Sequence, residues 1–407
     1  MIVLDISRLL SRAGRGTPTG IDRVEIAYAQ HLIADDSGSG FAAIKPTGGL
    51  GLLPARPSHQ FVESLAACWR GEMAPPHRAS TVERLARQLR VRLLGARERT
   101  LTRRLRDRPD AVYLLVSHHH LEKAEQLARL KRRSRARFVC LIHDLIPVQY
   151  PEYAKPGQAA NHLRRIRNAA AFADALIVNS GVTRDAMQGE LDRARRALPV
   201  LVAPFGTDLP ATSGDGGPPL TRPYFVSVGT IEGRKNHLLL LNLWRQLATE
   251  LGDDAPLLVL IGQRGWETEN VIDLLERCPA LRGAVIEHNA LPDTEMVRLL
   301  RGARAVLLPS FAEGFGFPVI EALALGVPVL CSDIAALHET GGDIPEFFDP
   351  LDGPGWRAAI LAYAAPHSPR RAAQLARLDG WRPPLWQDHF SAVGRFIDEV
   401  AAAPPIP

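Results

Sequence analysis

The chain has 407 residues, which suggests roughly two to three domains, and its 46% apolar and 23% charged residues exclude a disordered chain. Four widely separated cysteines exclude a disulfide framework and a Cys-rich zinc site, and they are typical of reduced thiols in a cytosolic protein. No apolar run approaches the ~18 residues of a membrane span, and the start Met1–Asp5 lacks a signal peptide's features. We therefore expect a cytoplasmic protein, peripheral at most to the inner face of the cytoplasmic membrane.

The formal net charge of +5 hides an asymmetry between the two halves of the chain. Residues 1–210 carry a net charge of +13, whereas residues 211–407 carry −8. Ten arginines interleaved with leucines predict basic helix over residues 84–108. This half could face an anionic membrane or a lipid-diphosphate acceptor, or its arginines could pair with acids of the same fold and solvate helices. We expect no nucleic-acid partner.

Short β-branched or aliphatic runs bounded by turn residues predict buried strands along the whole chain. Helical patterns separate many of them, as over His237–Leu251, Asn270–Arg277 and Thr294–Arg301. Strands alternating with helices predict an α/β protein with parallel sheets. The expected strands are Ile2–Ile6, Ala111–Val116, Arg137–Ile142, Ala175–Val178, Pro199–Ala203, Tyr224–Val228, Leu257–Ile261, Ala305–Leu308 and Val327–Cys331.

The elements divide into two α/β domains, expected over residues 1–205 and 206–383, with the turn-rich stretch Thr212–Pro219 as linker. Residues 46–80 are rich in Pro and Gly without clear periodicity, so we interpret them as loop. The run His118–His120 follows a strand. Because no carboxylate or Cys spacing supports a metal site there, we interpret it as a polar loop.

The segment Phe311–Glu321 contains the richest chemical pattern. Gly314 and Gly316 allow a tight turn after a buried strand, and Pro318 suits the first position of a helix. A helix N-terminus binds anions, and the carboxylates at Glu313 and Glu321 accept hydrogen bonds from hydroxyl groups. A phosphate-bearing sugar needs both kinds of contact. The alternative is a helix start at which Glu313 merely faces the positive end of the dipole.

Two further positions lie where ligands bind in open α/β sheets, outside the carboxyl ends of strands. Arg234 and Lys235 follow the strand Tyr224–Val228 and suit a diphosphate, the alternative being a solvated basic turn. His143 ends the strand Arg137–Ile142 and is either a site residue or a structural histidine.

Together these segments resemble the retaining two-domain glycosyltransferases, a GT-B family (family 4-like, glycosyl transferases group 1) that includes bacterial mannosyl-, rhamnosyl- and glucosyltransferases. Glu313 and Glu321 form its paired glutamates, and residues 232–236 match its phosphate loop. Further matching segments are Thr19–Val24, His143–Pro147, Asn179–Ser180, Phe205–Asp208, Ser332–Gly342 and Phe348–Pro350. Many relatives carry another Arg near Gly229 or Thr230, which this sequence lacks.

The resemblance implies two Rossmann-like domains facing a central cleft, an acceptor domain and a donor domain, with the helix over residues 384–400 returning to the first. Glu313 would contact the donor sugar, and Glu321, with Gly314, Phe315, Gly316 and Phe317 beside it, would hold the donor. Arg234 and Lys235 would stabilise the leaving diphosphate. Gly20 would let the first loop approach the donor, and His143 would lie near the reacting sugar.

The implied reaction is metal- and cofactor-independent transfer of a hexose, with retention, to a glycan or lipid-linked glycan in bacterial polysaccharide assembly. GDP-mannose is favoured as donor, with UDP- and dTDP-hexoses as alternatives. The sequence offers no obvious second carboxylate beside Glu313 to act as nucleophile, which favours front-side displacement. A nucleotide-sugar epimerase and an inactive assembly scaffold stay open. An NAD-dependent oxidoreductase is disfavoured because no GxGxxG follows the first strand.

Overall fold

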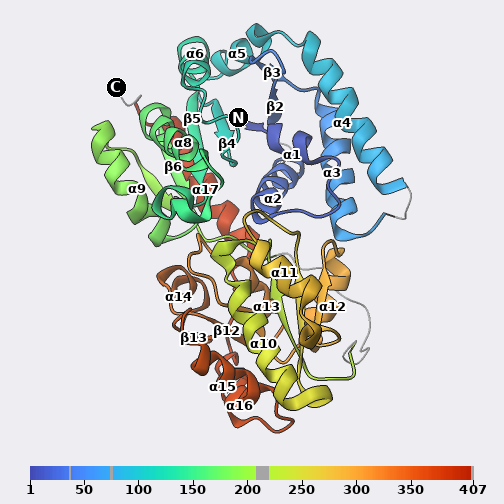
Figure 1. Cartoon of the computed structure of the whole chain (residues 1–407). Coiled ribbons are helices and arrows are strands. Elements are labelled where there is room, and N and C mark those ends of the chain that lie inside the picture. The colour runs from blue at the N-terminus through green and yellow to red at the C-terminus, as the bar shows by residue number, and fades with distance from the viewer. Residues whose placement is uncertain (36–37, 74–76, 208–219, 405–407) are drawn as a thin grey trace. The chain divides into compact units, whose positions relative to one another are not determined.

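The computed structural model describes residues 1–35, 38–73, 77–207 and 220–404 (Figure 1). The chain forms two compact units, each of which is an α/β sandwich. The first contains residues 1–149, 156–206 and 385–407, and the second contains residues 150–155 and 207–384. The expected linker Thr212–Pro219, as well as Asp208, lies outside the described residues.

Within the described residues, the strands of the first unit form one sheet in the order β3-β2-β1-β4-β5-β6-β7. All neighbours pair in parallel except β2 and β3, which form an antiparallel edge. The order reverses between β1 and β4, so the carboxyl ends of these two strands mark the switch point at which such sheets bind ligands. The strands are β1 (Ile2–Asp5), β2 (Gly40–Ile44), β3 (Leu50–Leu52), β4 (Val112–Leu115), β5 (Arg137–Ile142), β6 (Ala175–Val178) and β7 (Val200–Val202).

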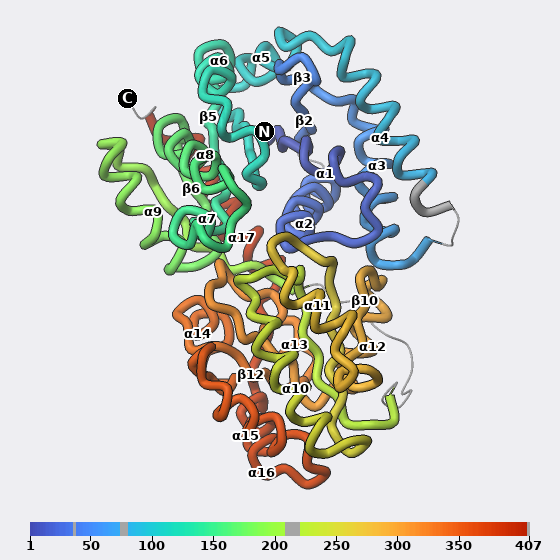
Figure 2. The backbone as a smooth tube through the Cα atoms, in the orientation of Figure 1, coloured from blue at the N-terminus to red at the C-terminus, as the bar shows by residue number. Residues whose placement is uncertain are grey.

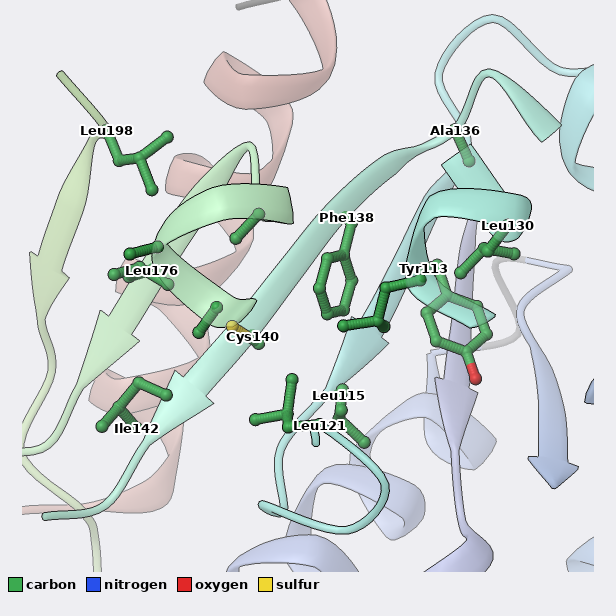
Figure 3. Packing of buried hydrophobic residues seen from close by; sticks show 14 of the residues in the cluster. Tyr113, Leu115, Leu121, Leu130, Ala136, Phe138, Cys140, Ile142, Leu176 and Leu198 are labelled. Atoms are coloured by element: carbon green, nitrogen blue, oxygen red, sulfur yellow. The ribbon is translucent and has the colours of Figure 1, made fainter. Parts of the chain in front are cut away.

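Alternation along the strands places large apolar side chains on each face of this sheet. Figure 3 shows Phe138, Cys140 and Ile142 of β5 on one face, packed with Tyr113 and neighbouring leucines in a fully buried cluster. The helices of the unit are α1 (Ser7–Arg12), α2 (Gly20–Ala34), α3 (Ala55–Arg70), α4 (His77–Gly95), α5 (Glu98–Arg106), α6 (Ala124–Ser134), α7 (Ile146–Gln149), α8 (Gln158–Phe172), α9 (Gly181–Ala194) and α17 (Trp386–Ala402).

The loop expected over residues 46–80 is wrong, because this stretch contains β3, the sixteen-residue helix α3 and the start of α4. Pro54 caps α3 and Pro57 lies in its first turn, where proline costs no hydrogen bond, so the prolines start a helix here. Buried Phe61, Leu65 and Trp69 then follow one another four residues apart along one helix face. The basic stretch 84–108 is helical as predicted, but it divides between α4 and α5.

The C-terminal helix α17, red in Figure 2, packs beside β5 of the first unit. His389 of this helix donates from Nδ1 to the carbonyl of Pro204 (3.0 Å) and accepts at Nε2 from the hydroxyl of Tyr28 (2.8 Å). A Cβ added at Gly206 would lie 2.1 Å from the backbone nitrogen of Trp386. Glycine at 206 is therefore required where the helix begins.

In the second unit, the described strands form a fully parallel sheet in the order β10-β9-β8-β11-β12-β13. Two apolar clusters cover its faces, one around Trp244 and Trp356 and the other around Val319 and Leu323. The strands are β8 (Tyr224–Val228), β9 (Leu257–Ile261), β10 (Val285–His288), β11 (Val306–Leu308), β12 (Val329–Ser332) and β13 (Glu346–Phe348). The helices are α10 (His237–Leu251), α11 (Glu269–Arg277), α12 (Asp293–Gly302), α13 (Phe317–Ala324), α14 (Ala335–Gly341), α15 (Gly353–Ala364) and α16 (Pro369–Arg377).

Among the described residues, no helix combines the length and apolar character needed to cross a membrane. Cys140 and Cys331 are buried free thiols, and Cys68 and Cys278 are half-buried ones.

Candidate active site

The donor loop, residues 311–316, connects β11 to the N-terminus of α13. Gly316 caps the helix with φ +100°, and a Cβ there would lie 2.6 Å from Cδ2 of Leu337, so other residues would be both strained and crowded. The hydroxyl of Thr340 in α14 donates to the carbonyl of Phe315, and this hydrogen bond ties the loop to α14. Pro318 is the second residue of α13, one position later than predicted, because the helix already begins at Phe317.

The phosphate loop, residues 229–236, connects β8 to α10 through a short 3-10 turn over Gly233–Lys235. Gly229 has φ +145°, and a Cβ there would lie 3.4 Å from Cε of Lys235. That distance is an ordinary van der Waals contact, so it is the positive φ that favours glycine at 229. Asn236, with φ +54°, ends the turn and donates from Nδ2 to the carbonyl of Pro350.

The two loops are joined through backbone and side chains. The amide of Phe311 donates to the carbonyl of Arg234 (2.8 Å), and Nη1 of Arg234 donates to the carbonyl of Ala312 (2.7 Å) and to Oε2 of Glu313 (2.9 Å). Nζ of Lys235 donates to Oε1 of Glu313 (2.6 Å). Residues that are 78 positions apart therefore meet in one charge cluster.

The protonation state of Glu313 follows from this cluster. Burial raises its pKa, but the positive charges of Lys235 and Arg234 outweigh burial and bring the pKa down to about 2. Glu313 is thus an ionised, acceptor-only carboxylate at neutral pH, suited to receive hydrogen bonds from hydroxyl groups. Burial and the same two cations lower the pKa of the adjacent His237 to about 4, so this imidazole is neutral.

A further carboxylate, that of Glu232, contacts Arg234 of the cluster. Glu232 is buried, and its Oε1 accepts a hydrogen bond from Nη2 of Arg234 (2.5 Å). Arg234 thereby bridges Glu232 and Glu313 with the fork geometry of a guanidinium. Glu232 stands two residues before Arg234 in the sequence. Its carboxylate can reach Arg234 because the backbone is extended at Glu232 and then forms a 3-10 turn.

The remaining donor-loop candidates also belong to the second unit. Phe315 is buried and packs edge-to-face on Phe317 at 5.3 Å between ring centroids. Glu321 is buried in α13, with 7% of its surface exposed. Gly314 lies between Glu313 and Phe315 in the loop. The individual roles of these residues in donor binding stay predictions.

His143 belongs to the first unit, at the carboxyl end of β5, and is 5% exposed. Its Nε2 lies 2.7 Å from the carbonyl of Val116, which can only accept, so Nε2 carries the hydrogen and Nδ1 the lone pair. The backbone amide of His143 donates to Nε2 of His118 (3.1 Å). Burial lowers the pKa of His143 to about 4, and the ring is a neutral hydrogen-bonding group at physiological pH.

Gly20 is the exposed first residue of α2. Thr19 and Asp22 form a capping box around it, and Asp22 also accepts from Nε of Arg8 at 2.6 Å. Helix α1 and residues 13–19 lie between β1 and Gly20, and the capping box fixes the start of α2. The approach of Gly20 to a donor stays a prediction.

The histidine run lies at the end of β4 and is partly buried. His118 packs against the rings of His143 and His162, at 5.3 and 4.8 Å between centroids. In the described part of the chain, no group of three His, Cys, Asp or Glu residues has the arrangement of a metal site.

Comparison with known proteins identifies the second unit. Residues 211–343 match the family model of glycosyl transferases group 1. This part of the chain is therefore similar to that family. The matched segment contains both the phosphate loop and the donor loop.

The curated relatives are glycosyltransferases of bacteria. O-antigen chain mannosyltransferase B of Escherichia coli is 36% identical over 165 residues, which cover 40% of this chain and 43% of that protein. The serotype-specific mannosyltransferase WbdA of Escherichia coli is 28% identical over 251 residues, which cover 58% of this chain and 30% of that protein. The chain thus spans less than half the length of these relatives.

Solved structures extend the likeness to the whole chain. Sucrose-phosphate synthase of Thermosynechococcus elongatus superposes with a TM-score of 0.65 over 99% of both chains at 17% identity. HepE of Anabaena, solved with UDP-glucose, gives a TM-score of 0.60 over 98% of both chains at 14% identity. At such identities the likeness establishes the fold, which is GT-B with two Rossmann-like domains, as predicted.

Proposed function

We propose that the chain is a retaining hexosyltransferase that moves a sugar from a nucleotide-diphosphate donor to a growing bacterial glycan. The observation that carries this proposal is the cluster of Lys235, Arg234 and Glu313, whose glutamate belongs to the loop that leads into the N-terminus of α13. It combines cations and a helix N-terminus for a diphosphate with an ionised acceptor for sugar hydroxyls.

Lys235 is the principal leaving-group cation in this proposal. An ammonium group has three hydrogens, so its contact with Glu313 leaves donors for a phosphate oxygen. Arg234 is held on three sides by Ala312, Glu232 and Glu313. Its main contribution is therefore to fix the orientation of Glu313 and to add positive charge near the diphosphate.

The proposed reaction is a front-side displacement at the anomeric carbon. The bond from the acceptor oxygen to that carbon forms on the face from which the phosphate oxygen departs, and the acceptor proton passes to the departing phosphate. Catalysis then depends on positioning and on cations that meet the developing phosphate charge, so the proposal needs no metal ion. Glu232 is committed to Arg234, which argues against a role as nucleophile.

The names of the relatives, which are mannosyltransferases and in two cases mannosyltransferases of the O-antigen chain, support mannose as the transferred sugar and a bacterial polysaccharide as the product. The proposal adds GDP-mannose as the favoured donor, with UDP- and dTDP-hexoses as the competing donors. It also adds a glycan or lipid-diphosphate-linked oligosaccharide as acceptor at the cytoplasmic side of the membrane. In this proposal the second unit holds the donor, and the first unit, with Gly20 and His143, holds the acceptor and approaches the reacting sugar.

A basic surface of the first unit supports contact with an anionic membrane. Val91 and Leu94 of α4 are 62% and 57% exposed, and Arg84 and Arg87 precede them on the same helix face. Within the described residues, none of the ten arginines of residues 84–108 forms an ion pair with an acid of the fold. Exposed apolar side chains among unpaired arginines are typical of helices that lie on anionic lipid.

The test is a thermal-shift screen of GDP-mannose, UDP-glucose and dTDP-rhamnose, followed by product analysis. A ligand at 100 times its dissociation constant stabilises the folded state by ~2.7 kcal/mol. Transfer of the sugar with an unchanged anomeric configuration, read by NMR, supports the proposal. An epimerised nucleotide sugar, an inverted product or the lack of any nucleotide binding would each refute it.

A further inference from the structure

A six-residue segment, Tyr150–Lys155, belongs to the second unit although both its neighbours in sequence belong to the first. We call this segment the strap. It includes a 3-10 turn over Pro151–Tyr153 and follows α7, seven residues after His143. The chain therefore leaves the first unit after Gln149 and returns to it at Pro156. It also crosses from one unit to the other after residue 206 and before residue 385.

Tyr153 packs the strap against the donor loop and the phosphate loop. Its ring stacks on Phe311 at 5.7 Å between centroids and 7° between planes. Its Cδ1 lies 3.5 Å from the position that a Cβ of Gly233 would occupy, which is an ordinary van der Waals distance, so the ring faces this position of the turn. The side chain thus touches the first residue of the donor loop and the turn that carries the cations.

Trp266 makes two further contacts with the strap. Its Nε1 donates to the carbonyl of Tyr153 (3.2 Å), and Nζ of Lys155 lies 5.2 Å from its ring centroid, within cation–π distance. The neighbouring amide of Gly265 donates to the carbonyl of Ile231 (2.8 Å), in the phosphate loop. Strap, phosphate loop and the loop after β9 therefore form one connected group.

The contacts of Tyr153 lead directly to the charge cluster. Phe311, under its ring, donates its amide to the carbonyl of Arg234, and Gly233, at its edge, precedes Arg234 and Lys235. A change in the position of either residue changes the backbone from which these cations extend. Nothing in the reaction requires the hydroxyl of Tyr153, whereas the ring supports both loops.

We propose that Tyr153 is a positioning residue of the donor site, which holds the phosphate loop and Phe311 so that Lys235 and Arg234 face the diphosphate. This inference rests on the proposed function. The strap begins seven residues after His143 in the chain, and it meets the donor and phosphate loops only through packing and hydrogen bonds. The ring acts on the reaction through Arg234 and Lys235 and makes no contact with the reacting atoms.

The experiment compares Tyr153→Ala with Tyr153→Phe and with Tyr150→Ala, a matched change at a more exposed ring of the same strap. Binding of GDP and UDP is measured by calorimetry, and initial rates are measured against donor and acceptor concentrations. We expect Tyr153→Ala to raise the donor KM and the nucleotide Kd about tenfold, the scale of one aromatic pair and its packing. The acceptor KM should stay the same, and Tyr153→Phe and Tyr150→Ala should resemble the wild type.

Wild-type donor KM and nucleotide affinity in Tyr153→Ala would overturn the inference, as would an equal rise of both KM values. Should Tyr153→Ala fail to fold, Trp266→Phe provides the second variant, since it keeps a ring and removes the hydrogen bond to the strap. A rise in donor KM alone then supports the inference, and wild-type kinetics overturn it. If the wild-type protein binds no nucleotide in the same titrations, the proposed function itself fails.

Discussion

Nζ of Lys235 lies 2.6 Å from Oε1 of Glu313, so the phosphate loop and the donor loop meet in a buried ion pair. The side chains are 13% and 7% exposed, which leaves little solvent screening between them. A donor that places phosphate on Lys235 and sugar hydroxyls on Glu313 would share this pair. The pair therefore orients both groups before either is needed in the transition state.

Replacing Lys235 by alanine should lower turnover by about 100-fold or more, because a charge-assisted contact that strengthens as phosphate departs would be lost. Initial rates of nucleotide release measure the effect. Arg245→Ala removes an exposed cation from α10 and serves as the control. Near-normal turnover in Lys235→Ala would contradict the assignment, provided circular dichroism shows a folded protein.

The two glutamates should differ in kinetics. Glu321→Ala should mainly raise the donor KM, because the lost contact is one of binding. Glu313→Ala should mainly lower kcat, because in the proposed reaction its carboxylate meets the reacting sugar, and because it contacts both Lys235 and Arg234. Steady-state rates over a range of donor concentrations separate the two effects. Equal changes of KM alone in both variants would refute this division of roles.

Acid should weaken the first unit through its buried histidines. Burial lowers the pKa of His143 and His119 to about 4 and that of His118 well below its usual value. An unfolded histidine titrates near ~6.5, so between about pH 6.5 and 4 the unfolded chain binds more protons than the folded one. The free energy of unfolding should therefore fall as pH falls through this window.

Urea unfolding followed by circular dichroism at pH 7.5, 6.5 and 5.5 measures this dependence. His118→Asn should reduce the fall in the free energy of unfolding between pH 6.5 and 5.5. The variant lacks one of the histidines that stay neutral in the folded state and bind a proton on unfolding. His338→Gln removes a half-exposed histidine from the second unit and is the matched control. A slope that His118→Asn leaves unchanged would show that other groups govern acid unfolding.

The sequence predicts elements best where strands are buried on both faces and helices are strongly periodic. The bounds of β5, β6, β8, β9 and α10 are those expected from runs of branched residues. Strands with weaker apolar patterns, such as β2, β10 and β13, were missed, because they lie toward sheet edges and contain Gly or charged residues. Helix α3 was missed because its prolines were interpreted as loop residues.

The candidate site likewise has a part that the sequence predicts and a part that it does not. Chain order and motif spacing predict that Arg234, Lys235 and Glu313 follow parallel strands, and β8 and β11 are neighbours whose carboxyl ends meet. Sequence patterns contain no signal for contacts made by irregular segments. The stacking of Tyr153 on Phe311 and the bridge from Arg234 to Glu232 depend on backbone angles that neither composition nor period records.

The last prediction concerns the exposed face of α4. If it meets anionic lipid, the protein should sediment with vesicles containing phosphatidylglycerol but not with phosphatidylcholine vesicles, and salt should release it, since screening shortens attraction to ~8 Å at physiological ionic strength. Arg84→Glu with Arg87→Glu, or Val91→Ser with Leu94→Ser, should reduce sedimentation while transfer to a short soluble acceptor stays the same. Arg184→Glu with Arg193→Glu, on exposed positions of α9, controls for net charge.

Equal binding to both kinds of vesicle, or to neither, would remove the membrane contact from the proposal. Loss of soluble-acceptor activity in the α4 variants would instead make this face part of the fold or of the acceptor site.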